Sequence, residues 1–353
     1  MEDIQLMRIK GRGTASNPPN RFNKFHIERD PGCPIGRETE FYLDHSRSPF
    51  SRNSSPDLPF TFSLNPYRGC EHGCIYCYAR PSHEYLGFSS GLDFETKILV
   101  KKDVPGLMAE EFERQRWSPQ TVVLSGNTDP YQPVESKLRL TRACLDVFLR
   151  YRNPVGIITK NYRITKDLDL LAEMAKLNLV SVAVSITSLD DKLIGKLEPR
   201  TSRPARRLQV IEKLSSAGVP VSVFVAPVIP GLTDQELPAI LKAAVDSGAT
   251  SAAYMLLRLP RSVEILFREW LQMHYPEREK KVLGRLRSMR GGALSDSRFG
   301  VRMRGEGVWA DVLSSLFKLS VQKLHLNEER IALNTTLFRR IRNGQISLFD
   351  KSV

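Results

Sequence analysis

Three cysteines within eight residues carry the most distinctive chemistry of this sequence. They lie in the segment NPYRGCEHGCIYCYAR, where Cys70, Cys74 and Cys77 follow the spacing CX3CX2C. Thiolates are the soft ligands that iron–sulfur clusters require. Three thiolates from one loop can bind three corners of a [4Fe–4S] cluster and leave the fourth iron open to a small molecule, much as a catalytic zinc keeps one position free. The spacing therefore predicts a cluster with one open coordination position.

The cysteines also allow two other interpretations. One is a structural zinc site with His72 or His83 as the fourth ligand, and the other is a set of unrelated thiols. Zinc sites usually contain paired CX2C segments, and the sequence has no second pair. Five cysteines are an odd and low number, which argues against a disulfide scaffold. Because only Cys33 and Cys144 remain, we expect no second cluster with three or more cysteine ligands.

Short β-branched runs alternate with amphipathic segments from residue 60 onward, which is typical of parallel strands with helical crossovers. The expected strands cover residues 61–65, 121–125, 155–159, 180–186, 219–226 and 251–257. The expected helices cover residues 104–116, 136–151, 166–177, 203–217, 234–247 and 262–274. Six such units, with the cysteines directly after the first strand, predict an α/β fold with a partial (β/α)6 barrel. A Rossmann-like open sheet is the alternative, but no G-x-G-x-x-G follows the first strand. In both folds the active face lies at the carboxyl ends of the strands.

Composition divides the chain into four predicted segments. They are an irregular N-terminal arm at 1–59, a barrel core at 60–275, a basic helical C-terminal extension at 276–330 and a tail at 331–353. The apolar content of 41% and the charged content of 26% are globular values that exclude wholesale disorder. The longest apolar stretch is too short to cross a bilayer, and the first ten residues do not resemble a signal peptide. We therefore expect a cytoplasmic protein.

The net charge of +13 is concentrated in two segments. Residues 137–166 contain eight Lys or Arg and one acid, and residues 258–304 contain twelve and five. A surface that neutralises phosphates must concentrate positive charge in this way, so nucleic acid is an expected partner. Solvated helix faces are the alternative explanation.

The CX3CX2C loop after the first strand of such a chain resembles the radical S-adenosylmethionine (SAM) superfamily over about residues 60–260. The resemblance implies that the open iron binds SAM and that reductive cleavage yields a 5′-deoxyadenosyl radical, which abstracts a substrate hydrogen. It also implies a reducing partner such as flavodoxin or ferredoxin.

Four further segments, CIYCYAR, TDP, ITK and LEPRTSRP, resemble the spore photoproduct lyase and DNA-repair-photolyase-like branch. By position, the resemblance implies SAM-binding roles for Tyr76, Thr128, Asp129, Lys160, Ser185 and Arg200. Each also has a plainer explanation: Ser185 as a small core residue, Lys160 as a solvated strand end and Asp129 as a helix cap.

Tyr76 and Tyr78 flank the third cysteine, as does a tyrosine pair assigned to a hydrogen-atom relay in the lyase. The lyase also requires a cysteine hydrogen donor after its second strand, where this sequence has Ser125-Gly126-Asn127. Cys144 is the remaining candidate, but it lies inside an expected helix and is interpreted as a core thiol. The difference speaks against spore photoproduct repair itself and leaves radical generation unaffected.

The C-terminal segment QISLF resembles the peptides that bind the bacterial sliding clamp. Leu348 and Phe349 would enter an apolar pocket and Gln345 would set the register. The alternative is a tail that folds back onto its own domain.

Three functions follow as hypotheses. The first is a radical SAM enzyme that acts on nucleic acid, with lesion repair in DNA favoured. The second is a radical SAM enzyme with a peptide, RNA or small-molecule substrate. The third is a zinc-stabilised nucleic-acid-binding protein without catalysis.

Overall fold

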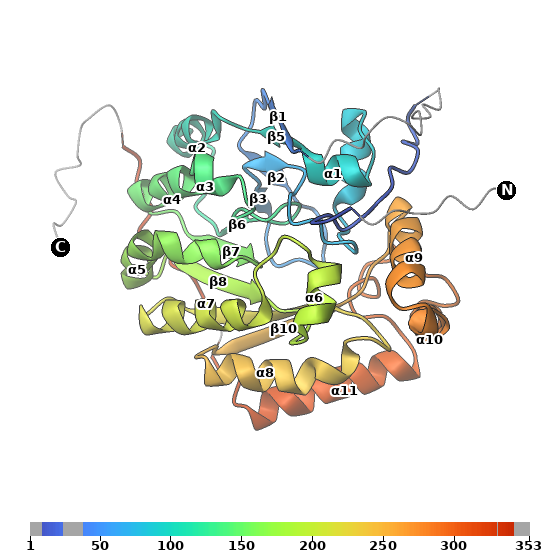
Figure 1. Cartoon of the computed structure of the whole chain (residues 1–353). Helices are drawn as coiled ribbons and strands as arrows, with labels where there is room; N and C mark the ends of the chain where they lie inside the picture. The colour runs from blue at the N-terminus through green and yellow to red at the C-terminus, as the bar shows by residue number, and fades with distance from the viewer. Residues whose placement is uncertain (1–8, 24–37, 330, 342–353) are drawn as a thin grey trace.

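A curved seven-stranded sheet forms the centre of the protein, in a computed structural model that describes residues 9–23, 38–329 and 331–341 (Figure 1). Its strand order is β10-β9-β8-β7-β6-β3-β2. The strands are β2 (Phe50–Arg52), β3 (Phe62–Leu64), β6 (Val122–Leu124), β7 (Val155–Thr159), β8 (Val180–Ser185), β9 (Val221–Val228) and β10 (Ser251–Leu256). All neighbours pair in parallel except β2, which is antiparallel to β3 at one edge. The six predicted strands and the partial (β/α)6 barrel are thus confirmed.

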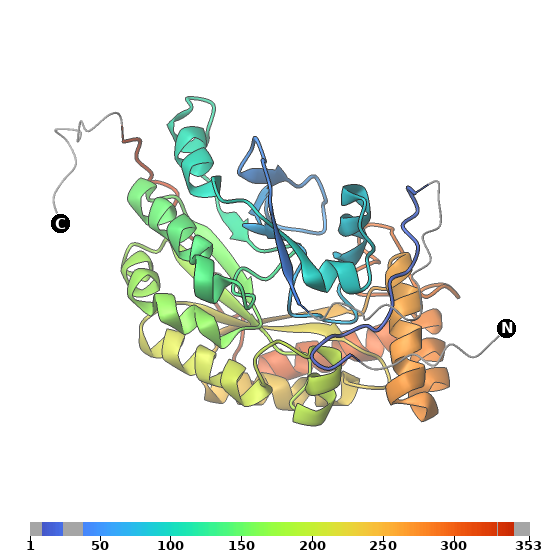
Figure 2. The same ribbon diagram turned by 45° about the horizontal axis from the view of Figure 1, so that its top comes forward.

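Helices cover the outer face of the sheet (Figure 2). They are α2 (Val104–Glu113), α3 (Glu135–Leu138), α4 (Leu140–Tyr151), α5 (Leu168–Lys176), α7 (Pro204–Ser216) and α8 (Leu237–Asp246). The predicted helix at 136–151 is divided because Arg139 adopts a left-handed conformation with φ +50°. The predicted helix at 166–177 begins as the 3-10 turn η2 (Tyr162–Asp167). A short helix, α6 (Asp191–Leu197), was not predicted.

Alternating valines explain how one face of the central strands is buried. In β8 and β9, every second residue is a buried valine whose branched side chain suits the pleated surface. These valines pack against the apolar faces of α4, α5, α7 and α8 in one continuous core. The residues between these valines, such as Ser181, Ala183 and Phe224, are only partly buried and form the opposite face of the strands.

A second, three-stranded sheet supports the cysteine loop. Its order is β1 (Glu40–Leu43), β5 (Lys97–Val100) and β4 (Tyr67–Arg68). The segment between β4 and β5 contains the cysteines, the 3-10 helix η1 (Arg80–Leu86) and α1 (Leu92–Thr96). The predicted irregular arm therefore contributes two short strands, β1 and β2, while the rest of its described residues form turns and extended chain.

Three helices follow β10: α9 (Ser262–His274), which lies within the predicted core, and α10 (Pro276–Ser288) and α11 (Val308–Lys323), which lie in the predicted C-terminal extension. Helices α9 and α10 form an apolar cluster with Cys74, Ile75 and Tyr76 of the cysteine loop. Helix α11 lies beside α8 (Figure 1). Residues 331–341 return to the core, where Phe338 packs against Phe112. None of the helices in the described ranges is long and apolar enough to cross a membrane.

Candidate active site

A cavity opens at the carboxyl ends of the barrel strands, beside the cysteine loop. Its walls include the side chains of Cys70, Cys74, Cys77, Tyr76, Tyr78, Thr128, Asp129, Lys160 and Ser185. The structure therefore brings together all of the residues predicted for the cluster and the cofactor except Arg200. Apolar side chains complete the wall, among them Ile158, Phe224 and Met255.

Backbone and side-chain hydrogen bonds fix the shape of the cysteine loop. The Cys70 amide donates to Phe94 O at 2.9 Å, and the Ile75 amide donates to Leu197 O at 3.0 Å. Arg80 donates from Nε to Cys74 O at 3.0 Å and forms a 2.6 Å ion pair with Glu95. Both side chains of this pair are fully buried, so each charge depends on the other.

The N-terminal arm closes over the same loop. Glu95 accepts hydrogen bonds from the backbone amides of Gly13 and Thr14, at 2.9 and 3.2 Å. A Cβ atom on Gly13 would lie 1.7 Å from Gly73 O, so the arm touches the loop backbone directly. Gly73 itself adopts φ +66°, a conformation that favours glycine.

We expect Gly73→Ala to destabilise the protein by about 1–2 kcal/mol, since an alanine is strained in the left-handed region. Its Cβ would also lie 2.6 Å from Glu95 Oε2 and would disturb the Arg80–Glu95 pair. Urea denaturation measures the change. Gly284→Ala is the control, because this helical glycine has no atom within 4 Å of the added Cβ. The control should gain about 0.5–1 kcal/mol, and an equal effect of both substitutions would contradict the explanation.

The three thiols are held in a largely dry setting. Cys70 and Cys74 are buried and Cys77 is partly exposed. Burial raises the pKa of all three thiols. The two histidines considered as a fourth ligand have other partners: His72 Nε2 lies 2.9 Å from Asn161 Nδ2, and His83 Nε2 lies 2.9 Å from Lys97 O. Within the described ranges, no three His, Cys, Asp or Glu side chains are placed to hold a single metal ion.

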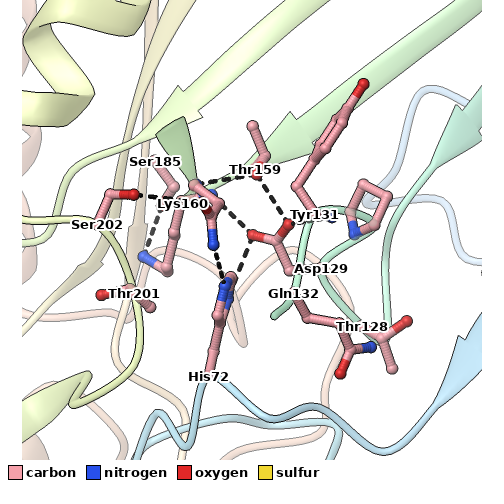
Figure 3. A network of polar contacts seen from close by, with 12 residues as sticks. His72, Thr128, Asp129, Tyr131, Gln132, Thr159, Lys160, Ser185, Thr201 and Ser202 are labelled. Carbon is pink, nitrogen blue, oxygen red and sulfur yellow. Dashed lines mark hydrogen bonds and ion pairs between the residues drawn. The ribbon is translucent and has the colours of Figure 1, made fainter. Parts of the chain in front are cut away.

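Asp129 organises the end of β6 and β7 (Figure 3). Its carboxylate accepts from the Thr159 hydroxyl at 2.8 Å and from the Lys160 amide at 2.7 Å. The His72 Nδ1 atom lies 3.5 Å from the same carboxylate. Burial lowers the pKa of His72, although Asp129 acts in the opposite direction, so the ring is neutral and can accept from Asn161. Asp129 also accepts from the Tyr131 amide at 2.9 Å, so it caps a local turn as well as facing the cavity.

Lys160 joins the ends of three strands. Its Nζ atom lies 2.8 Å from Ser185 Oγ, 3.1 Å from Thr187 Oγ1 and 2.9 Å from Ala226 O. The same ammonium lies 3.3 Å from Glu198 Oε1. The solvated strand end considered for Lys160 is therefore wrong, because 15% of its side chain is exposed and its donors are engaged by partners.

A buried ion pair lies behind Lys160. Glu198 contacts Arg207 Nη2, and Arg207 Nη1 donates to Ser185 O at 2.8 Å. The Tyr76 hydroxyl donates to the other oxygen of Glu198. Burial alone would raise the pKa of Glu198, but the charges of Arg207 and Lys160 outweigh it and hold that pKa far below its usual range.

The two tyrosines differ in their surroundings. Tyr76 is 7% exposed, and its hydroxyl is engaged by Glu198 and Thr187. Tyr78 is 39% exposed, and its hydroxyl donates to Gly126 O in the loop after β6. The hydroxyl of Tyr78 therefore lies beside the segment 125–127 in which the lyase pattern would place its cysteine.

Other predicted residues have mainly structural contacts or lie elsewhere. The Thr128 hydroxyl donates to Tyr67 O at 3.2 Å. Arg200 pairs with Glu71 at 3.0 Å and is not part of the cavity wall. Cys144 is fully buried in the core between α4 and the sheet, as predicted. The predicted clamp-binding residues Gln345, Leu348 and Phe349, like Cys33, lie outside the described residues.

Sequence inspection missed Glu198, Arg207 and Thr187. Glu198 stands two residues before Arg200 in LEPRT, so the right segment was chosen and the wrong charge within it. One signal was available in the sequence: an acid, Glu198, and a base, Arg207, lie on either side of a short segment that contains two prolines. Their pairing, however, requires the start of α7 to turn back toward β8. Only the fold brings that about.

Known proteins share much of this architecture. The model of the radical SAM superfamily matches residues 64–244. An uncharacterized protein of Mycobacterium tuberculosis, Rv2578c, is 40% identical over 222 residues, which is 62% of this chain and 65% of that protein. An uncharacterized protein of Methanocaldococcus jannaschii, MJ0683, is 25% identical over 232 residues, or 66% of this chain and 82% of that one. The match thus covers just under two thirds of the mycobacterial relative.

Spore photoproduct lyase shows the same fold. A variant of this lyase with bound AdoMet and dinucleoside spore photoproduct has a TM-score of 0.57 and 15% identity, covering 80% of this chain and 78% of that one. The lyase complexed with dinucleoside spore photoproduct has a TM-score of 0.57 and 16% identity, covering 80% and 79%. At these identities the likeness concerns the fold. With the family model matching more than half of its length, the chain belongs to the radical SAM superfamily and has the fold of its spore photoproduct lyase branch.

Proposed function

We propose that this protein is a radical SAM enzyme that acts on nucleic acid, with DNA favoured. The observation that carries the proposal is that the three thiols of the cysteine loop line the same cavity as Asp129, Lys160 and Ser185. Metal ligands and charged groups of both signs, within reach of one cavity, suit a zwitterionic molecule held beside a metal cluster.

The donor set fits the proposed cluster. Cys70, Cys74 and Cys77 supply three soft ligands from one loop, and no fourth cysteine lines the cavity in the described structure. The raised thiol pKa values mean that these ligands need a positive partner to ionise, which bound iron provides. When bound, a [4Fe–4S] cluster with one open iron supplies the electron and the coordination position for reductive cleavage of SAM.

The chain's own residues would position the reactants. Asp129 and Lys160 offer a carboxylate and an ammonium that can pair with an amino and a carboxylate group. Ser185 offers a hydroxyl on the same cavity wall, already bonded to Lys160. We assign the hydrogen-atom relay to Tyr78 in preference to Tyr76, because the Tyr76 hydroxyl is committed to the buried Glu198.

A second cavity supports a nucleic-acid substrate. It is lined by Arg139, Arg142, Arg163 and Lys166 from the predicted basic segment, together with the carboxylates of Glu135 and Asp167. Tyr131 lines this cavity, two residues from Asp129 in the first one. Four cations beside the proposed active site match what a phosphate backbone requires, although Arg142 is partly neutralised by Asp167 and Asp169.

The other partners remain sequence-based proposals. A reductant such as flavodoxin or ferredoxin follows from the proposed chemistry. Binding to the sliding clamp and a cytoplasmic location rest on the sequence alone. Substrates such as a peptide, RNA or a small molecule are the alternative for the same cavity, because superfamily membership does not determine the substrate.

The proposal is tested with the anaerobically reconstituted protein. Reduced with dithionite, it should convert SAM to 5′-deoxyadenosine and methionine, measured by chromatography. Binding to ultraviolet-damaged and intact DNA should weaken steeply as salt increases. Absence of 5′-deoxyadenosine would contradict the radical chemistry, whereas salt-independent or absent DNA binding would contradict the substrate class.

Phenylalanine substitutions separate the two tyrosines. Tyr76→Phe should cost about 1–3 kcal/mol of stability, because it removes a hydrogen bond from the buried Glu198. Tyr78→Phe should change stability by less than about 0.5 kcal/mol, and it should lower product formation about tenfold or more, equivalent to ~1.4 kcal/mol of activation free energy. Urea denaturation and product analysis measure the two effects. Full turnover by Tyr78→Phe would refute the relay.

A further inference from the structure

Arg258 lies where the proposed active site meets the basic C-terminal segment. It follows β10, and its side chain lines the same cavity as the cysteine loop. Its guanidinium carbon is 5.5 Å from the centroid of the Tyr78 ring. Tyr78 is the tyrosine assigned above to the hydrogen-atom relay, and its hydroxyl is bonded to Gly126 O. Arg258 therefore shares one side of the cavity with this tyrosine.

No carboxylate in the described part of the chain forms an ion pair with this arginine. Across residues 9–23, 38–329 and 331–341, no Asp or Glu oxygen lies within 4.0 Å of its guanidinium nitrogens, and its one polar contact is Nη1 to Met303 Sδ at 3.8 Å. A thioether is a weak acceptor. A guanidinium has five N–H donors, so most of them remain available to a ligand.

The surroundings of Arg258 are themselves positively charged. Burial lowers the pKa of Arg258, and the charge of Arg302 lowers it further. Burial lowers the pKa of Arg290 to about 10, with the charge of Arg258 contributing. Asp57 raises the pKa of Arg258, but it is engaged by Arg302 at 2.5 Å. Asp296 raises the pKa of Arg290, but it pairs with Arg298 at 2.7 Å. The carboxylates near Arg258 and Arg290 are therefore engaged by other arginines, an arrangement that an anionic ligand would relieve.

Arg290 is a second buried arginine in this region, and its hydrogen-bond donors are not all used. It is 2% exposed and donates to the backbone oxygens of Leu257 and Arg302. Its Nε atom is buried without a hydrogen-bond partner in the described structure. Arg290 thus joins the residue before Arg258 to the segment that contains Arg302.

We propose that Arg258 binds a phosphodiester of the substrate and thereby places the attached nucleoside against the reactive end of the cavity. The inference rests on the proposed function, since it takes this cavity as the site of reaction. The apolar side chains of Phe224, Met255 and Leu257 line the same cavity and suit the flat face of a base. An anion-binding arginine next to an apolar wall matches a nucleotide better than a carboxylate-bearing peptide.

The test compares two ligands that differ by one charge. They are thymidylyl-thymidine with a natural phosphodiester and the same dinucleotide with an uncharged methylphosphonate linkage. Isothermal titration calorimetry with the reconstituted wild-type protein should show about tenfold tighter binding of the phosphodiester, or ~1.4 kcal/mol. Arg258→Gln should bind both ligands equally, and Arg258→Lys should recover part of the preference because it restores the charge.

Arg304→Gln is the matched control, since it removes one exposed charge from the same segment and should keep the full preference. Equal binding of both ligands by the wild type would overturn the proposal without any variant. So would a full preference in Arg258→Gln, or Arg258-dependent binding of an acidic dipeptide that is tighter than that of the dinucleotide. Failure of the proposed function shows separately, as absence of 5′-deoxyadenosine from wild-type protein.

Discussion

Replacing Cys70, Cys74 and Cys77 together with alanine should abolish iron binding and SAM cleavage. The three side chains lie in one loop at one cavity, and alanine offers no ligand in their place. After anaerobic reconstitution, wild-type protein should contain about four irons and four sulfides per chain. Electron paramagnetic resonance of the reduced protein should show a cluster signal that SAM perturbs. The triple variant should show neither iron nor the signal.

Cys144→Ala is the control within the same chain. Cys144 is fully buried in the core, away from the cavity, so its loss should leave iron content and the spectrum unchanged. It should cost about 1 kcal/mol of stability, because a small cavity remains in the core. A triple variant that keeps its full iron content would refute the cluster assignment. One tightly bound zinc in the wild type, with no iron incorporated, would favour the zinc-stabilised alternative.

The single alanine variants should also differ little from the triple variant in SAM cleavage. A cubane held by three thiolates loses its defined open position when one thiolate is removed, since water or a substitute ligand then competes for that iron. Chromatographic assay of 5′-deoxyadenosine measures this for each variant. Single variants that each keep about two thirds of the wild-type turnover would contradict the shared site.

The barrel was predictable because its strands carry a simple pattern. Runs such as VSVAVS and VSVFVAPV are too β-branched and too short for helices, and capping residues separate them from the amphipathic segments. Strand ends in a parallel sheet meet at one edge, so Asp129, Lys160 and Ser185 could be expected close together from their positions alone. The structure places all three on the same cavity.

Residues that act through long-range pairing could not be found in this way. Arg200 was predicted from the family resemblance of its segment LEPRT, but its partner Glu71 lies 129 positions earlier, at 3.0 Å in space. Glu198 instead contacts Lys160 of the site from behind, at 3.3 Å, just after the end of α6, and Arg207 reaches it from the first turns of α7. Short edge strands such as β1 were missed for a related reason: their stability comes from pairing with β5, not from an apolar pattern of their own.

Arg207→Leu should be among the most destabilising substitutions in this protein. The Glu198–Arg207 pair is 0–1% exposed, and Arg207 also holds Ser202 O and Ser185 O, at 2.7 and 2.8 Å. Removal of one partner from a buried pair leaves an uncompensated charge and costs about 3–5 kcal/mol. Urea denaturation at neutral pH measures the loss. Glu198→Gln combined with Arg207→Leu should recover part of it, because the stranded charge is then gone.

The same pair predicts how stability depends on pH. The pKa of Glu198 is held far below its usual range, so the folded state keeps this carboxylate ionised where the unfolded state, with a pKa of about 4.3, already binds a proton. Its contribution is therefore fully present above about pH 4.3 and declines as the pH falls toward the folded-state pKa. In Glu198→Gln this contribution is absent at every pH. The difference in unfolding free energy between wild type and variant should thus shrink as the pH is lowered from 6 to 3. A difference that grows over this range would show that the ion pair is not what stabilises the end of β8.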